Sequence, residues 1–162
     1  MSRHPLATAG QGAHRYACRV YYEDTDADGT VYHATYLRLA ERARTEALRD
    51  LHIPHAEMTR LHGLIFMVRR AKLDYLAPAR LDDHLIVATR PLVIGAASVV
   101  LLQSFHRMEQ PEPALVVAEI QLACVRLGDM RPARIPPRWR ETLAQLGAQR
   151  GAAPHVARTP PN

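Results

Sequence analysis

The sequence has no run of about 18 consecutive apolar residues, the length that a membrane-spanning helix requires. The first 15 residues also lack the apolar segment of a secretory signal. There are only two cysteines, Cys18 and Cys124, and neither belongs to a C-x-x-C pair or to a zinc-ligand spacing. These absences argue against a membrane anchor, a disulfide framework and a metal site. We expect a cytoplasmic protein whose two thiols are buried and reduced.

Positive charge is concentrated at one end of the chain. The formal net charge is +5 at pH 7, and residues 131–162 account for all of it with six arginines and one glutamate. Residues 1–130 carry 15 basic and 15 acidic side chains and are therefore neutral overall. A nucleic-acid-binding domain usually presents a basic patch on its folded body. The distribution therefore argues against nucleic acid as a partner.

Apolar periodicity and turn residues predict a single domain in which one long helix packs against one sheet. The 162 residues, of which 48% are hydrophobic, suffice for one core. We expect a flexible leader at 1–14, a folded domain at 15–147 and a disordered tail at 148–162. The expected strands are 15–22, 64–76, 84–94, 97–107 and 114–127, and the expected helices are 34–51 and 136–147. Short links between consecutive strands predict an antiparallel meander, so the fold class is α+β.

The long helix has one face composed mainly of alanine, so we expect it to lie close to the sheet. The residues of this face are Tyr36, Ala40, Ala43, Ala47 and Leu51. Glu41 and Arg44 are three residues apart on the same helix. Side chains at this spacing are neighbours, and we expect these two to pair in a structural role.

The segment 21–33 (YYEDTDADGTVYH) crowds three carboxylates, Asp24, Asp26 and Asp28, just before the long helix. A calcium loop of the EF-hand type is disfavoured, because the twelfth residue from Asp24 is Thr35 and not Glu. One remaining interpretation is a solvated turn with local hydrogen bonds. The other is a catalytic carboxylate beside a helix N-terminus, whose amide donors can hold a developing negative oxygen.

Two strings in this region, YYEDTDADGTVYHATY (21–36) and ERARTEALR (41–49), resemble the signature of the Tol–Pal-associated acyl-CoA thioesterases. Those enzymes belong to the 4-hydroxybenzoyl-CoA thioesterase branch of the hotdog superfamily. The resemblance continues in VRRAKLDYLAPARLDD (68–83) and CVRLGDMRPARIP (124–136), so it spans roughly 19–137. It implies a hotdog fold, in which a curved antiparallel sheet wraps a long central helix.

The resemblance also implies a catalytic pair. It places the catalytic carboxylate at Asp26, which would act on the thioester carbonyl either as nucleophile or as general base for water. It places the helix start at His33, whose backbone N–H is the expected oxyanion donor. The imidazole of His33 is free for a second role, such as orienting water or substrate. Gly29 is expected to allow the backbone geometry of the turn.

Five other side chains are candidate substrate contacts. Tyr22 and Tyr32 either line the acyl pocket or belong to the core. Arg69, Arg70 and Lys72 form a basic strip that either binds the CoA phosphates or is simply solvated.

The chain departs from the family pattern at two places. Asp28 stands where many members have Gly, and its charge is expected to favour the protonated form of Asp26 or to repel an anionic acyl group. The turn 95–98 (GAAS) lacks the basic residue that relatives often carry there.

The sequence therefore predicts an enzyme that hydrolyses acyl-CoA to free acid and CoA, without a metal or organic cofactor. The acyl group is expected to be short-chain aliphatic or aromatic, or longer, with acyl carrier protein as an alternative carrier. An exposed sheet edge predicts a homodimer, and the resemblance implies a homotetramer. The alternative is a non-catalytic hotdog module that binds acyl-CoA or acyl carrier protein. A hotdog dehydratase ranks last, because such enzymes resemble the segment 21–49 poorly.

Overall fold

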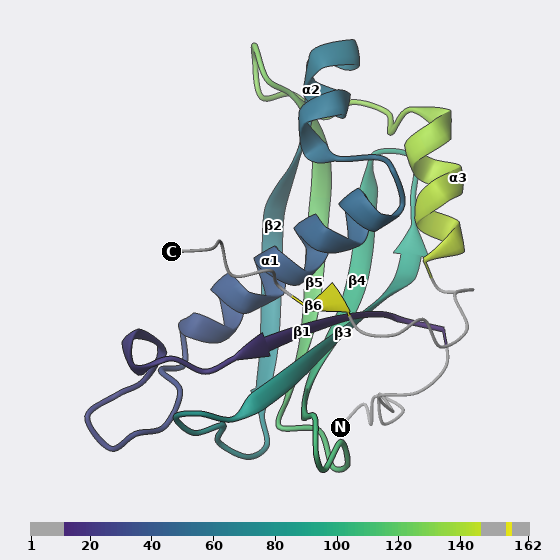
Figure 1. Cartoon of the computed structure of the whole chain (residues 1–162). Helices are drawn as coiled ribbons and strands as arrows, with labels where there is room; N and C mark the ends of the chain where they lie inside the picture. The colour runs from purple at the N-terminus through teal and green to yellow at the C-terminus, as the bar shows by residue number, and fades with distance from the viewer. Residues whose placement is uncertain (1–11, 147–154, 157–162) are drawn as a thin grey trace, which may run out of the picture.

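The computed structural model describes residues 12–146 and the backbone of residues 155–156 (Figure 1). Residues 1–11 of the predicted flexible leader lie outside the described residues. The predicted disordered tail, 148–162, also lies outside them, except for residues 155–156. Within the described ranges, no helix is both long enough and apolar enough to cross a membrane.

The described residues form a curved sheet wrapped around one long helix, so the predicted α+β class is confirmed (Figure 1). The strands are β1 (His14–Arg19), β2 (Leu64–Tyr75), β3 (His84–Ile94), β4 (Ser98–Arg107), β5 (Val116–Arg126) and β6 (His155–Val156). The helices are α1 (Thr35–Asp50), α2 (His55–His62), α3 (Pro137–Gln145) and the short 3-10 helix η1 (Tyr22–Asp24). The spatial order is β2-β5-β4-β3-β1-β6, and β6 pairs with β1 in parallel while the other neighbours are antiparallel.

The predicted meander is wrong for β2. Only β3, β4 and β5 follow one another as neighbours, whereas β2 pairs with β5 at the far edge of the sheet. Two strands separate β2 from β3, a distance of roughly 14 Å at about 4.8 Å per strand. The linking residues 76–83 span this distance easily at up to about 3.3 Å each. A short link therefore does not require that the strands it joins be adjacent.

The prediction also misplaces the end of β1 and omits one helix, while the bounds of the other predicted strands differ by at most two residues. β1 ends at Arg19, three residues before the predicted end, because η1 begins at Tyr22. Helix α2 was not predicted, although its flanking residues carry helix signals. Pro54 precedes its first residue, and Gly63 follows its last with a left-handed φ of +62°.

Helix α1 buries the predicted alanine-rich face against the concave side of the sheet. Ala40 and Ala43 are fully buried, and Tyr36 packs edge-on against Phe105 at a ring-centroid distance of 5.2 Å. Small side chains allow the helix axis to approach the strands closely along this face. Figure 1 shows the consequence for function: the loops preceding α1 lie at one end of the helix, and α2 and α3 lie at the other.

Candidate active site

Residues 25–31 form a tight hairpin just before α1. Thr25 pairs with Val31, the backbone N–H of Asp26 donates to Thr30 O (2.8 Å), and the N–H of Gly29 donates to Asp26 O (3.0 Å). Gly29 has a φ of +78°, in the left-handed region that favours glycine. The hairpin therefore places Asp26 at the first position of its turn, where the residue is exposed.

Two of the three crowded carboxylates accept hydrogen bonds from residues of the same segment. Asp24 is buried, and its Oδ2 accepts the N–H of Tyr21 (2.9 Å). Asp28 is exposed, and its Oδ1 accepts both the N–H (3.0 Å) and the hydroxyl (2.8 Å) of Thr30. These bonds stabilise the charged form and lower the pKa of Asp28 below its ordinary value. Both side chains therefore serve the fold of the segment.

Asp26 differs from its two neighbours. Its carboxylate makes no hydrogen bond or ion pair with any residue that the structure describes, and it is exposed to solvent. A carboxylate of this kind remains available to a ligand. The structure thus distinguishes Asp26 from Asp24 and Asp28, which the sequence could do only through the resemblance.

The start of α1 supplies amide donors beside this hairpin. The helix begins at Thr35, two residues after His33, and its N-cap is Ala34, whose side chain cannot accept a hydrogen bond. The N–H of Thr35 donates to Tyr32 O (2.9 Å). The N–H groups of His33 and Ala34 have no acceptor among residues 12–146. They are therefore free donors at the positive end of a 16-residue helix.

Tyr75, at the end of β2, fixes the position of this helix start. Its hydroxyl donates to His33 O at 3.0 Å, and its ring packs edge-on against Tyr36 at 5.7 Å. The hydroxyl of Tyr36 in turn accepts the N–H of Ala79 (3.1 Å), whose carbonyl accepts the N–H of Val31 (2.9 Å). These bonds tie β2 and the following loop to the hairpin. The sequence alone assigns no role to Tyr75, although this residue lies within a string that carries the resemblance.

The candidate substrate contacts fall into two groups. Tyr22 and Tyr32 are 82% and 43% exposed, so the alternative that they belong to the core is wrong. Both lie in the loop region that contains Asp26 and His33. Arg69, Arg70 and Lys72 lie along β2 and are exposed. A β-bulge interrupts the pairing of β2 with β5 between Val68 and Arg70, so simple alternation of faces does not hold at Arg69.

The turn 95–98, which lacks the expected basic residue, receives one from elsewhere in the chain. Arg140, on α3, donates from Nε to Gly95 O (3.2 Å). A guanidinium therefore lies at this turn, although it comes from a distant part of the sequence.

Comparison with known proteins decides the family. Residues 20–145 match the model of the thioesterase-like superfamily. The chain is also 41% identical over 121 residues to the acyl-CoA thioesterase YbgC of Haemophilus influenzae, which covers 75% of this chain and 87% of that protein. The chain belongs to the thioesterase-like superfamily.

Two solved structures confirm the predicted hotdog fold. A probable thioesterase from Bartonella henselae is 32% identical, with a TM-score of 0.69 and coverage of 76% of this chain and 99% of that one. A 1,4-dihydroxy-2-naphthoyl-CoA thioesterase from Synechocystis is 24% identical, with a TM-score of 0.76 and coverage of 83% and 98%. The second likeness supports the fold alone.

Proposed function

We propose that the protein is an acyl-CoA thioesterase that hydrolyses the thioester to a free acid and CoA. The observation that carries this proposal is the contrast among the three carboxylates. Asp24 and Asp28 are engaged locally, whereas Asp26 is unengaged and shares its loop region with the free N–H groups of His33 and Ala34. The relative from Haemophilus influenzae is itself an acyl-CoA thioesterase, which supports the same reaction.

The proposed chemistry uses these groups in either of two ways. As a nucleophile, the Asp26 carboxylate bonds to the carbonyl carbon, CoA leaves as the thiolate, and water then hydrolyses the mixed anhydride. As a general base, Asp26 takes a proton from the water that attacks the carbonyl carbon. On both routes the carbonyl oxygen becomes negative. The N–H groups of His33 and Ala34 would stabilise it, aided by the helix dipole.

Substitution of Asp26 tests the proposal. Wild type, Asp26→Asn and Asp26→Ala are assayed against a panel of acyl-CoAs of increasing chain length and against an aromatic acyl-CoA. We expect wild type to hydrolyse part of the panel and both variants to lose about 10²-fold or more in kcat. The folded state should be preserved, since the Asp26 side chain makes no bond to the described residues.

Asp28→Asn is the matched control, because it removes an acidic group from the same hairpin and should retain most of the activity. Absence of hydrolysis by wild type, or full activity of both Asp26 variants, would refute the proposal. Tight binding of acyl-CoA without turnover would instead indicate the non-catalytic binding module.

We also infer a homodimer formed through the exposed edge of β2. In the described sheet, β6 covers the β1 side, whereas β2 has only β5 as a neighbour. Met67 and Val68 on β2 are 47% and 50% exposed, and an open, partly apolar edge strand favours pairing with another strand. Antiparallel pairing of two β2 strands would bring Tyr75 of one protomer near the beginning of β2 of its partner.

Light scattering tests this dimer. Val68→Asp would place like charges near each other across the paired strands and should shift the protein toward the monomer. Val93→Asp is the control, because Val93 is 59% exposed but lies on β3, away from this edge. An unchanged dimer in Val68→Asp would show that β2 does not form the interface.

The remaining assignments are inferences from the resemblance and from composition. They are the homotetramer, the Tol–Pal association, the 4-hydroxybenzoyl-CoA branch and acyl carrier protein as an alternative carrier. Binding of the CoA phosphates by Arg69, Arg70 and Lys72 belongs with them, and their exposure supports it. The proposed reaction needs no metal or organic cofactor, because a carboxylate and amide donors supply its chemistry. We propose a cytoplasmic location, which the two free cysteines support. The expectation that both thiols are buried is wrong for Cys18, which is half-buried, whereas Cys124 is buried.

A further inference from the structure

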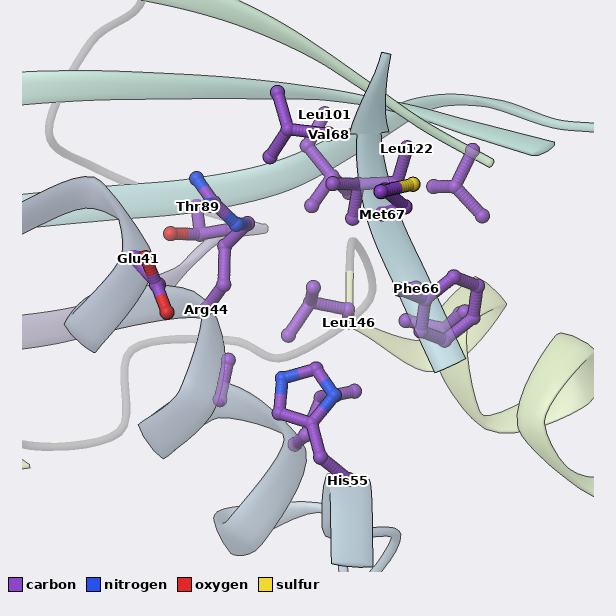
Figure 2. A pocket seen from close by; sticks show the side chains of 14 residues that line it. Glu41, Arg44, His55, Phe66, Met67, Val68, Thr89, Leu101, Leu122 and Leu146 are labelled. Atoms are coloured by element: carbon purple, nitrogen blue, oxygen red, sulfur yellow. The ribbon is translucent and has the colours of Figure 1, made fainter. Parts of the chain in front are cut away.

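A cavity of about 280 Å³ lies beside the C-terminal half of α1, between that helix, α2, α3 and the sheet (Figure 2). At 1.5 Å per helical residue, Arg44 in its wall lies roughly 15 Å along α1 from Ala34. The cavity is therefore distinct from the hairpin that carries Asp26. Its wall is mainly apolar, and the polar exceptions are Glu41, Arg44, His55 and Thr89.

Arg44 is the unusual member of this wall, because it is only 8% exposed. Its Nη1 donates to Gln103 Oε1 at 2.8 Å. Gln103 is held in place, because its Nε2 donates to Ala40 O (3.0 Å) and to Thr89 Oγ1 (2.9 Å). A guanidinium has five N–H donors. The described residues provide no acceptor for the donors on Nε and Nη2 of Arg44.

The charge of Arg44 also lacks a close partner. The predicted pairing with Glu41 is wrong, since no ion pair joins Glu41 and Arg44 among the described residues and Glu41 is exposed. Burial lowers the pKa of the Arg44 guanidinium, and the charge of Glu41 only partly offsets this effect. Arginine nevertheless stays protonated in proteins. A buried cation whose acceptor is a neutral amide is costly, and a ligand carboxylate would relieve that cost.

His55 adds a second polar group to the cavity. Its ring points toward the space between Arg44 and Leu146 in Figure 2. Burial, and next the charge of Arg44, lower the pKa of His55. The imidazole is therefore neutral near pH 7 and can donate one hydrogen bond without competing for the charge of Arg44.

We propose that this cavity binds an aliphatic carboxylate, with the carboxylate on Arg44 and the chain against Leu48, Leu101 and Leu146. Guanidinium and carboxylate form the strongest common charged hydrogen bonds, often through two parallel contacts. A water molecule occupies about 30 Å³ in the liquid, and a methylene group is of similar size. A cavity of about 280 Å³ therefore accommodates roughly nine non-hydrogen atoms. Hexanoate, with eight, fits this size. The site stands on its own geometry and does not require the proposed hydrolysis.

Calorimetric titration of the full chain with hexanoate tests the site. We expect hexanoate to bind more tightly than hexan-1-ol, which lacks the charge, and than acetate, which lacks the chain. Arg44→Gln keeps a donor for Gln103 but removes the charge, and should weaken hexanoate binding by about tenfold or more. Glu41→Gln removes a repelling charge and should tighten it. Arg42→Gln, an exposed arginine on the same helix, is the control and should change nothing.

Failure of hexanoate to bind overturns the proposal, and so does binding that neither Arg44→Gln nor Glu41→Gln alters. If thermal melts show that Arg44→Gln does not fold, Glu41→Gln decides, because its side chain is exposed. The source of the ligand is distinguished by inhibition of hexanoyl-CoA hydrolysis. Competitive inhibition identifies the site as the pocket for the acyl group, and non-competitive inhibition as a separate site for a free acid. If the protein proves not to hydrolyse acyl-CoA, the calorimetric titration with hexanoate still tests the cavity. Failure of the proposed function and failure of the proposed binding site are therefore distinguishable.

Discussion

Tyr75→Phe should slow catalysis while leaving the fold almost unchanged. The hydroxyl makes one neutral hydrogen bond, to His33 O at 3.0 Å, and Tyr75 is 51% exposed. Water can replace this bond at His33, which is also exposed, so we expect a stability loss of only about 0.5–1.5 kcal/mol. For a chain of this size, each kcal/mol lowers the Tm by roughly 2–4 °C.

The effect on the reaction should be larger than this small loss of stability suggests. Complete loss of one oxyanion donor typically costs about 10²–10³ in kcat. Tyr75 acts only by orienting the peptide group that joins His33 to Ala34, which carries both the His33 carbonyl and the Ala34 N–H. We therefore expect a smaller loss, about tenfold in kcat, with KM nearly unchanged, because an oxyanion forms only in the transition state.

The assay follows release of free CoA with a thiol reagent over a range of substrate concentrations, so that kcat and KM are separated. Thermal melts of the same samples report stability. Tyr36→Phe is the contrasting variant, because it removes the acceptor of the Ala79 N–H in the core. It should cost about 1–3 kcal/mol of stability. A wild-type kcat for Tyr75→Phe, or a loss confined to KM, would refute the role of Tyr75 in orienting the oxyanion donors.

Three further predictions concern buried or locally bonded groups. Burial lowers the pKa of His106, so its contribution to stability is complete above the ordinary value of 6.5 and is lost as the pH falls through the lowered one. Urea unfolding should show a steeper loss between about pH 7 and 5 for wild type than for His106→Gln, and equal slopes would contradict this. Burial, and next the charge of Asp24, raise the pKa of Cys18 to about 12, so iodoacetamide should label Cys18 far more slowly in the folded protein than in urea. Faster labelling of Cys18 in Asp24→Asn would support the contribution of the Asp24 charge. Rapid labelling of Cys18 in the native wild type would contradict both the burial and the charge effect. The bonds from Thr30 lower the pKa of Asp28, so its contribution is present above 3.8 and is lost as the pH falls through the lowered value. Melts in this acid range should show a weaker pH dependence for Asp28→Ala, and an unchanged dependence would contradict the role of the Thr30 bonds.

Most of the fold could be predicted from local pattern. The predicted bounds of β3 agree with the structure, and α1 differs by one residue at each end, because periodicity and turn residues act over a few neighbours. The position of β2 at the edge beside β5 could not be read in this way, because adjacency in a sheet depends on contacts between distant segments. The pairing of β6 with β1 is non-local for the same reason.

The candidate site divides in a similar manner. The string from Tyr21 to Arg49 identified Asp26 and His33 through its resemblance to a family. It could not show which carboxylates are engaged, because that depends on where the Tyr21 amide and Thr30 point after folding.

The sequence by itself determined the class of fold, the family signature and the pair of residues that we expect to carry the chemistry, since each is encoded in contiguous residues. Only the tertiary structure decided what surrounds them. Tyr75 reaches the His33 carbonyl across 42 residues of chain, and Arg44 meets Gln103 across 59. Hydrogen bonds at such separations form only after the sheet has wrapped around α1. The hydrogen bond from Tyr75 that holds the start of α1 is therefore a property of the folded chain. The same is true of the position of Arg44 in the cavity wall.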